Sequence, residues 1–222
     1  MVRPLLPMPS PQLRHLAVAL GLLCALPLGA GAADQRDSPA AALSSQSRAE
    51  CEAGRRAQTR EDRKVHFERG QELAEQAVGE DEQSAEAHFV LFCNMGELMR
   101  LDGESVSSVF ALRRLMAELD RAIEVDPHHS DALAAKGTLL VRLPRLLGGD
   151  VAKGEAMLRQ VVQLDPNAFT TRLTLAKTCD ARGERDEAVA FASRALQIAR
   201  SLGRADKIAE AQATLAELHA AR

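Results

Sequence analysis

Three segments of the chain resemble one another. They are SAEAHFVLFCNMGELMR, HSDALAAKGTLLVRL and AFTTRLTLAKTCDARG, at residues 84–100, 129–143 and 168–183. Each is followed by a second helical segment, and the first two of these close with Asp-Pro, at residues 119–127 and 158–166. A helix pair that recurs along a chain buries its apolar face by stacking on the next pair. The sequence therefore predicts an all-α protein organised as an α-α solenoid.

The amino-acid composition favours the same fold class. The chain has no Trp or Tyr and only six Phe, so Leu and Ala supply most of its apolar side chains. Such residues favour packed helices over a β-sandwich, which needs β-branched and aromatic side chains. A length of 222 residues allows one buried domain or a short array of repeats.

The spacing of small residues sets the register of the repeats. A small or branched residue recurs near the end of successive second helices, at intervals of 45, 39 and 34 residues: Ala77, Ala122, Val161 and Ala195. The tetratricopeptide repeat has a period of 34, and the chain resembles that family. The family's glycine position then falls on Phe92, Gly137 and Ala176, and its tryptophan position falls on His88, Leu133 and Arg172. We expect about three repeats, the first two with extra residues within the pair.

The stretch RLPRLLGGD, residues 142–150, interrupts the helical pattern. Pro144 is excluded from a helix interior, and Gly148 and Gly149 permit positive φ. Asp150 is a favourable N-cap for the segment that follows. We therefore predict that this stretch is the turn between the two helices of the second repeat, enlarged by five residues.

Helical patterns flank the repeats on both sides. The pattern turns helical from Ser47: residues 47–57 could form a short helix, and residues 60–81 predict a longer one with apolar side chains on one face. Near the C-terminus a stripe of apolar residues predicts the helix that closes the solenoid: Ile208, Ala211, Leu215 and Leu218. Residues 33–46 are small and polar, which is typical of a flexible leader. We therefore expect the repeat domain to span residues 47–222.

The first 32 residues have the pattern of a secretory signal peptide. They contain two arginines and no acid, then an apolar run at residues 16–28, then small residues suited to cleavage. The run is short for a membrane span and is interrupted by Pro27. Leu23 stands before Cys24 where a lipid-anchor signal needs a small residue. We expect a periplasmic or secreted protein that is not transmembrane after cleavage, and a lipid anchor is disfavoured.

The net charge narrows the class of partner, and the cysteine count limits the possible disulfides. The formal net charge is −3, and removal of residues 1–32 makes it more negative, so nucleic acid is not an expected partner. Cys51, Cys93 and Cys179 remain, which is an odd number for an oxidising compartment. Cys93 and Cys179 fit small buried helix residues, and a Cys51–Cys93 bridge is the alternative.

Motifs of catalysis and metal binding are missing from the sequence. It contains no G-x-S-x-G, H-E-x-x-H, C-x-x-C or P-loop pattern. His128 and His129 fall in a linker between repeats, where solvated turn residues are expected. The glycines and acid at residues 148–154 suit helix capping better than anion binding. We therefore expect a protein that is not an enzyme and has no cofactor or metal.

A narrower resemblance concerns the two enlarged repeats. The stretches GELMRLDGESVSSVFALRRLMAELDRAIEVDP and RLPRLLGGDVAKGEAMLRQVVQLDP look like the TatT component of tripartite ATP-independent periplasmic (TRAP) transporters. A similar layout occurs in the eukaryotic regulator of microtubule dynamics family, against which the bacterial-style signal argues. The TatT resemblance implies an envelope scaffold that binds a protein partner, including a periplasmic solute-binding protein, and that can form homo-oligomers.

The binding surface of such a solenoid lies along its first helices. The repeat register places there Phe89 and Cys93, Ala134 and Thr138, then Leu173 and Lys177. Only Lys177 suits a clamp for a terminal carboxylate, so an apolar or mixed groove is expected. The enlarged turn adds Arg142, Arg145, Leu146 and Leu147 as candidates for contact with a partner. For Phe89 and Leu173 the alternative is that they pack between helices. For the function, the alternative is a soluble periplasmic carrier that binds an apolar small ligand in the groove.

Overall fold

A computed structural model describes residues 38–103 and 107–220 of the chain. All regular structure in these ranges is helical, as predicted: α2 Pro39–Arg56, α3 Arg60–Glu80, α4 Ala85–Asp102, α5 Ser107–Val125, α6 Ser130–Arg142, the 3-10 helix η1 Arg145–Leu147, α7 Val151–Leu164, α8 Phe169–Ala181, α9 Arg185–Ser201 and α10 Ala205–Ala220. The predicted signal peptide at residues 1–32 lies outside the described residues. Within the described ranges, no helix combines the length and the apolar character needed to cross a membrane.

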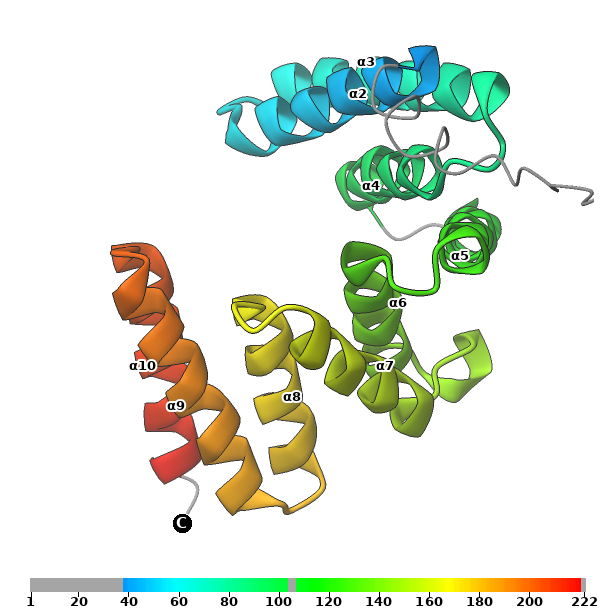
Figure 1. The fold of residues 1–222 in the computed structure, drawn as a ribbon. Helices are drawn as coiled ribbons and strands as arrows, with labels where there is room; N and C mark the ends of the chain where they lie inside the picture. Colours follow the sequence, from blue (N-terminus) through cyan, green and yellow to red (C-terminus); the bar gives the residue numbers. More distant parts are fainter. Residues whose placement is uncertain (1–37, 104–106, 221–222) are drawn as a thin grey trace, which may run out of the picture.

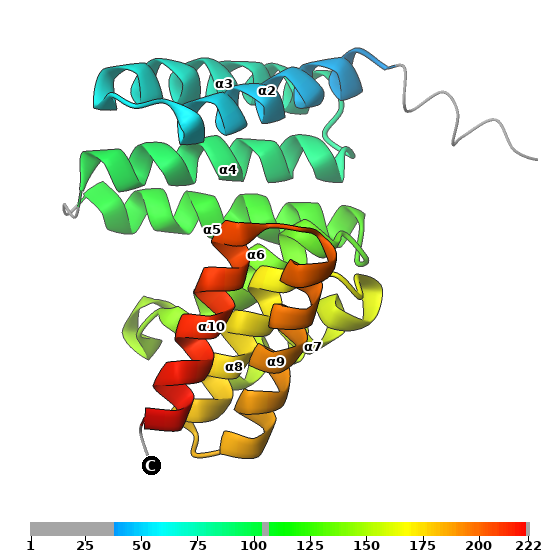
Figure 2. The same ribbon diagram turned by 90° about the vertical axis from the view of Figure 1, so that its left-hand side faces the viewer.

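The helices form a curved array of pairs. Helix α2 packs on α3, α4 on α5, α6 on α7 and α8 on α9, and α10 covers α9. Figure 1 shows the pairs following one another from α2 and α3 at the top to α9 and α10 at the lower left. In Figure 2, α2 to α5 run along one direction and α8 to α10 along another, so the array twists as it grows. The solenoid prediction is confirmed, and α10 closes it as expected.

The N-terminal part is more extensive than we predicted. Helix α2 begins at Pro39, so residues 39–46 are helical and the prediction of a flexible leader is wrong for them. Ser38 caps this helix by accepting a hydrogen bond from the Ala41 N–H, and proline is favourable at the first helical position. Because α2 packs on α3, the extra N-terminal element is a complete pair of helices.

Small residues let α2 approach its neighbours closely. The buried positions of this helix form one stripe of small side chains: Ala40, Ser44, Ser47, Cys51 and Gly54. A Cβ atom at Gly54 would collide with the ring of Phe67 in α3, and Ser47 Oγ donates a 2.7 Å hydrogen bond to the Gly70 carbonyl. Residues 39–46 looked like a leader because small polar residues are common in loops, whereas Ala40 and Ser44 belong to this packing surface.

The predicted register of the repeats is confirmed by burial. The four residues assigned to the small position are buried, with at most 2 % of their surface exposed: Ala77, Ala122, Val161 and Ala195. The three residues at the tryptophan position are buried as well: His88, Leu133 and Arg172. Two apolar clusters result, one within α3 to α6 and one within α8 to α10.

The buried His88 binds acceptors through both ring nitrogens. Its Nδ1 lies 2.7 Å from Glu118 Oε2, and its Nε2 lies 3.2 Å from the Glu82 carbonyl oxygen. Only a doubly protonated ring can donate to both acceptors. The hydrogen bond with Glu118 therefore raises the pKa of His88 above its ordinary value, against the effect of burial.

This interaction predicts a pH dependence of stability. Since the folded-state pKa of His88 is raised, its contribution is complete below the unfolded-state pKa near 6.5 and is lost as pH rises through the folded-state value. We expect wild type to lose on the order of 1 kcal/mol more than His88→Gln over that window. Urea unfolding of both proteins from pH 6 to 9 measures the difference, and parallel curves would contradict the assignment.

The turn at residues 143–150 lies where it was predicted, but Gly149 is required there for a reason other than positive φ. Asp150 caps α7, since its Oδ1 accepts a 3.0 Å hydrogen bond from the Lys153 N–H. Gly148 has φ 90°, as expected, whereas Gly149 does not adopt a positive φ. A Cβ atom at Gly149 would instead collide with the Leu143 carbonyl oxygen, so glycine is required there by a close approach of two backbone segments.

Candidate functional site

An open cavity of about 450 Å³ lies between the first helices of successive pairs. Its lining is mainly apolar and comes from α2, α4, α5, α6 and the start of α8: Arg55, Phe92, Cys93, Gly96, Met99, Arg100, Leu115, Ala134, Ala135, Thr138, Leu139, Arg142, Thr170 and Thr171. Because α4, α6 and α8 are the first helices of their pairs, this is the surface on which the sequence placed a binding groove.

A second cavity of about 330 Å³ continues along α8. It is lined by Val141, Arg142, Val151, Thr174, Lys177, Thr178, Ala181 and Arg182. Arg142 lines both cavities, and we refer to the two together as the groove. The residues that line it include five cationic side chains and no carboxylate. The groove therefore combines an apolar floor with a positive rim.

The five cations of the groove differ in how they are paired. Arg55 Nε and Arg100 Nη2 lie 2.6 and 2.5 Å from Oε1 of Glu97, a carboxylate that is buried. Arg182 pairs with two carboxylates of its own neighbourhood. Within the described ranges, Arg142 and Lys177 make no ion pair. These two side chains are available to an anionic group of a ligand.

The groove brings together four of the candidates chosen from the sequence. Cys93, Thr138 and Arg142 line its first cavity, and Lys177 lines its second together with Arg142. Of the two alternatives for Phe89 and Leu173, the structure has the packing between helices, and neither residue lines the groove. They are buried between helices, and Phe89 packs against Arg48, Phe92 and His129.

The enlarged turn does not contribute its leucines to the groove. Leu146 and Leu147 line a separate cavity of about 430 Å³ with residues of α5, among them Leu112 and Met116. Leu146 is 95 % exposed, so it does not tuck onto the helix pair. Arg145 is exposed and lines none of these three cavities. The predicted residues of the enlarged turn therefore do not form one surface with those of the first helices.

Several groove residues were missed by the sequence argument. Arg55 comes from α2, the helix whose first residues were assigned to the leader. Helix α4 is longer than α6 and α8, and Met99 and Arg100 lie in its additional C-terminal turn. A signal was present for these two residues, because the first repeat carries extra residues and a longer first helix reaches further along the groove.

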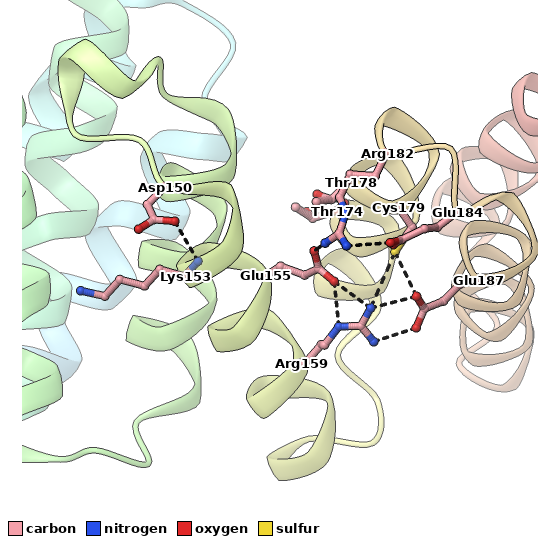
Figure 3. A network of polar contacts seen from close by, with 10 residues as sticks. All are labelled: Asp150, Lys153, Glu155, Arg159, Thr174, Thr178, Cys179, Arg182, Glu184 and Glu187. Carbon is pink, nitrogen blue, oxygen red and sulfur yellow. Dashed lines mark hydrogen bonds and ion pairs between the residues drawn. The ribbon is translucent and has the colours of Figure 1, made fainter.

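A network of charges joins α7, α8 and α9 beside the groove (Figure 3). Glu155 Oε1 accepts hydrogen bonds of 2.9 and 2.7 Å from Nε and Nη2 of Arg159, while Glu155 Oε2 pairs with Arg182. Arg159 also binds Glu187 at 2.7 Å, and Arg182 binds Glu184 at 2.6 Å. Hydrogen bonding to Arg159 lowers the pKa of Glu187. The carboxylates are thus balanced by guanidinium groups.

Three potential metal ligands meet in this network. Oxygen atoms of Glu155 and Glu184 and the sulfur of Cys179 lie within 4.8 Å of one another. Both carboxylates already bind arginine, and burial together with the nearby carboxylates raises the pKa of Cys179 to about 11. A cation would have to displace guanidinium groups and deprotonate this thiol, so the arrangement favours an ion-pair network over metal binding.

One histidine of the linker has a structural role that the sequence argument did not assign. His128 is exposed, as expected for a solvated turn residue. His129 is half-buried and caps α6, since its Nδ1 accepts a 3.2 Å hydrogen bond from the Ala132 N–H. The expectation of a solvated side chain is therefore wrong for His129.

Comparison with known proteins identifies the architecture. No protein-family model and no curated protein sequence matches the chain. Among solved structures, TTC0263, a thermophilic tetratricopeptide-repeat protein of Thermus thermophilus, superposes with a TM-score of 0.61 and 22% identity, over 82% of this chain and 84% of that chain. A double mutant of MamA from RS-1 superposes with a TM-score of 0.50 and 13% identity, over 83% of this chain and 96% of that chain. These similarities concern the fold alone, and by them the chain has the helical-repeat fold of a tetratricopeptide-repeat protein.

Proposed function

We propose that the protein is an interaction scaffold whose groove binds a segment of a partner protein that carries both apolar and acidic side chains. The observation that carries this proposal is the lining of the groove, which has an apolar floor, five cations and no carboxylate. An apolar side chain of the segment would be buried on Met99 and Leu139, and its acids would pair with Arg142 and Lys177. Such complementarity favours acidic partners and disfavours basic ones.

The proposed place of action is the cell envelope. Its support comes from the sequence, namely the signal-peptide pattern of residues 1–32 and the resemblance of the two enlarged repeats to TatT. In this proposal the partner is an envelope protein, and a periplasmic solute-binding protein is the candidate that the resemblance suggests. Cell fractionation with an antibody against the mature chain tests the location independently of any partner.

Filling the groove should abolish partner binding. Thr138 is half-exposed on the floor of the first cavity, and Thr138→Trp would occupy the space that an apolar side chain of the partner needs. We expect at least a 10-fold loss of affinity, as for a central position of an interface. Captures from the periplasm with protein tagged after Arg222, followed by titration of the captured partner, measure it.

A matched control separates loss of binding from loss of folding. Ala216 is exposed on α10 and lines none of the cavities described above, so Ala216→Trp adds the same side chain away from the groove. This control should keep wild-type affinity, and both variants should melt near the wild-type temperature. A partner that binds Thr138→Trp as tightly as wild type would place the binding surface elsewhere, and capture of no protein above background would argue against a scaffold.

A second candidate function is that of a carrier for an apolar small ligand. The first cavity has an apolar floor and a volume within the range of small-molecule sites. Native mass spectrometry of freshly purified protein distinguishes the two functions. A co-purified small molecule that Thr138→Trp excludes would favour the carrier, whereas an empty protein that still captures a partner protein would favour the scaffold.

A further inference from the structure

Two cysteines from different helices meet at the wall of the groove. Two hydrogen bonds fix the register of α2 against α4: Asn94 Nδ2 donates to Ser47 Oγ at 3.0 Å, and Arg55 Nε donates to Glu97 Oε1 at 2.6 Å. Cys51 lies one helical turn from both Ser47 and Arg55. Arg48 in α2 lies over the Phe89 ring of α4, 5.3 Å from its centroid, two turns before the pairing of Arg55 with Glu97. Cys51 lies between Arg48 and Arg55, and Cys93 lies one turn from both Phe89 and Glu97, so these contacts place Cys51 opposite Cys93. In keeping with this placement, the Cys93 thiol lowers the pKa of Cys51.

The backbones of α2 and α4 come close together at this level. The side chain of Asn94 in α4 reaches the carbonyl oxygen of Ser47 in α2, at 3.4 Å, as well as its hydroxyl group. Such an approach is possible because the facing positions of α2 are small residues. A disulfide needs Cα atoms about 4.4–6.8 Å apart and side chains that point toward each other. Close backbones and facing thiols are the conditions under which a bond forms without rearrangement of the helices.

The two sulfurs differ in how a reagent can reach them. Cys93 is half-exposed and lines the first cavity of the groove, whereas Cys51 is 3 % exposed. A small reagent in the groove therefore meets Cys93 first. The hydrogen bond from Cys93 lowers the pKa of Cys51, and the same pairing together with burial raises the pKa of Cys93. The charges of Arg55 and Arg100 also lower the pKa of Cys51 and remain when Cys93 is in a mixed disulfide, so Cys51 can attack in a second step that needs no access from solvent.

We propose that Cys51 and Cys93 form an intramolecular disulfide by exchange with a small disulfide such as glutathione disulfide, and so fasten α2 to α4 at the wall of the groove. Cys93 loses its proton to solvent, and its thiolate attacks the oxidant, forming a mixed disulfide and releasing one glutathione thiolate. The Cys51 thiolate then attacks Cys93 Sγ and releases the second. The two cysteines lose two protons and two electrons, and one disulfide of the oxidant is reduced to two thiols.

Peptide mapping of the oxidised full-length chain tests the proposal directly. The reduced protein is incubated with glutathione disulfide, alkylated and digested with trypsin. We expect residues 49–55 covalently linked to residues 70–100, in monomeric protein. Cys179 is a control within the same chain, because it is buried and lines neither cavity of the groove, and residues 178–182 should be recovered with an alkylated thiol. Glutathione retained on Cys93, or a bond between two chains, would overturn the proposal.

Two further measurements support the assignment of roles. Cys51→Ala should stop the reaction at the mixed disulfide on Cys93, and Cys93→Ser should leave Cys51 alkylated. The bridge closes a loop that includes α3, so oxidised wild type should melt roughly 5–10 °C above reduced wild type. Neither variant should show that increase. An oxidant-dependent increase of the same size in Cys93→Ser would contradict the proposed bond. The inference does not depend on the proposed function, since none of these experiments uses a partner.

Discussion

Replacing Gly154 with valine should lower the free energy of unfolding by about 3 kcal/mol or more. Gly154 in α7 faces Gly137 in α6, and a Cβ atom on Gly154 would lie 2.7 Å from the Gly137 carbonyl oxygen and 2.9 Å from Leu140 Cβ. The carbonyl belongs to a helix backbone and has no rotamer by which to move aside. The variant can fold only if α6 and α7 separate, which exposes the apolar side chains between them.

A second glycine provides the control for helix propensity. Gly79 in α3 has no atom within 4 Å of the place where its Cβ would stand, so Gly79→Val changes the propensity with no collision. We expect that variant to be neutral or slightly stabilised, since valine is more favourable than glycine within a helix. Urea unfolding followed by circular dichroism measures both. Equal losses in the two variants would show that the contact between α6 and α7 is not the cause.

Truncating Phe67 to alanine should destabilise the N-terminal part of the array by about 3–5 kcal/mol. The side chain is 0 % exposed and fills the space left by Gly54 of α2, so its removal leaves a cavity between α2 and α3. In a repeat array each pair contacts only its neighbours, so the loss should remain local. Hydrogen exchange should show lower protection in α2 and α3 and unchanged protection in α9 and α10.

Val65 is the matched control for this truncation. It lies in the same helix as Phe67 and is 62 % exposed, so Val65→Ala should change the stability by less than about 0.5 kcal/mol. If Phe67→Ala also reduced protection in α9 and α10 to the same degree, the array would unfold as one cooperative unit. The expectation that the helix pairs unfold nearly independently would then be wrong.

The fold could be predicted where the sequence carries a periodic signal. A small or branched residue recurs in each second helix, whatever the length of the helix pair, because it lies where two helices touch: Ala77, Ala122, Val161 and Ala195. The cap at Asp150 could be predicted from local chemistry alone. The start of α2 could not be predicted, because the small residues of α2 resemble a leader until the surfaces that they contact are known.

The groove could be predicted only in part. Phe89 and Cys93 lie one helical turn apart on the same face of α4, so the rotation of that helix, together with the residues that cover each level, decides which of them lines the groove. The repeat register cannot fix this rotation in the first repeat, where Phe92 occupies the position that is normally glycine. Of the five cations of the positive rim, only Arg142 and Lys177 were predicted. The others, Arg55, Arg100 and Arg182, were missed because the five come from four helices, and the pairing of these three with Glu97 and Glu155 depends on contacts distant in sequence.

The charge network of Figure 3 gives the array an electrostatic joint. The apolar clusters occupy α3 to α6 and α8 to α10, and the buried side chains Leu158 and Val161 of α7 belong to neither of them. Arg159 and Arg182 connect α7 to α8 and α9 by ion pairs, at the level where Arg142 joins the two cavities. Bending at this joint would change the width of the groove while both clusters stay intact. Because Glu155 is buried, salt should weaken the proposed attraction of an acidic ligand to the exposed Arg142 more than it weakens this network.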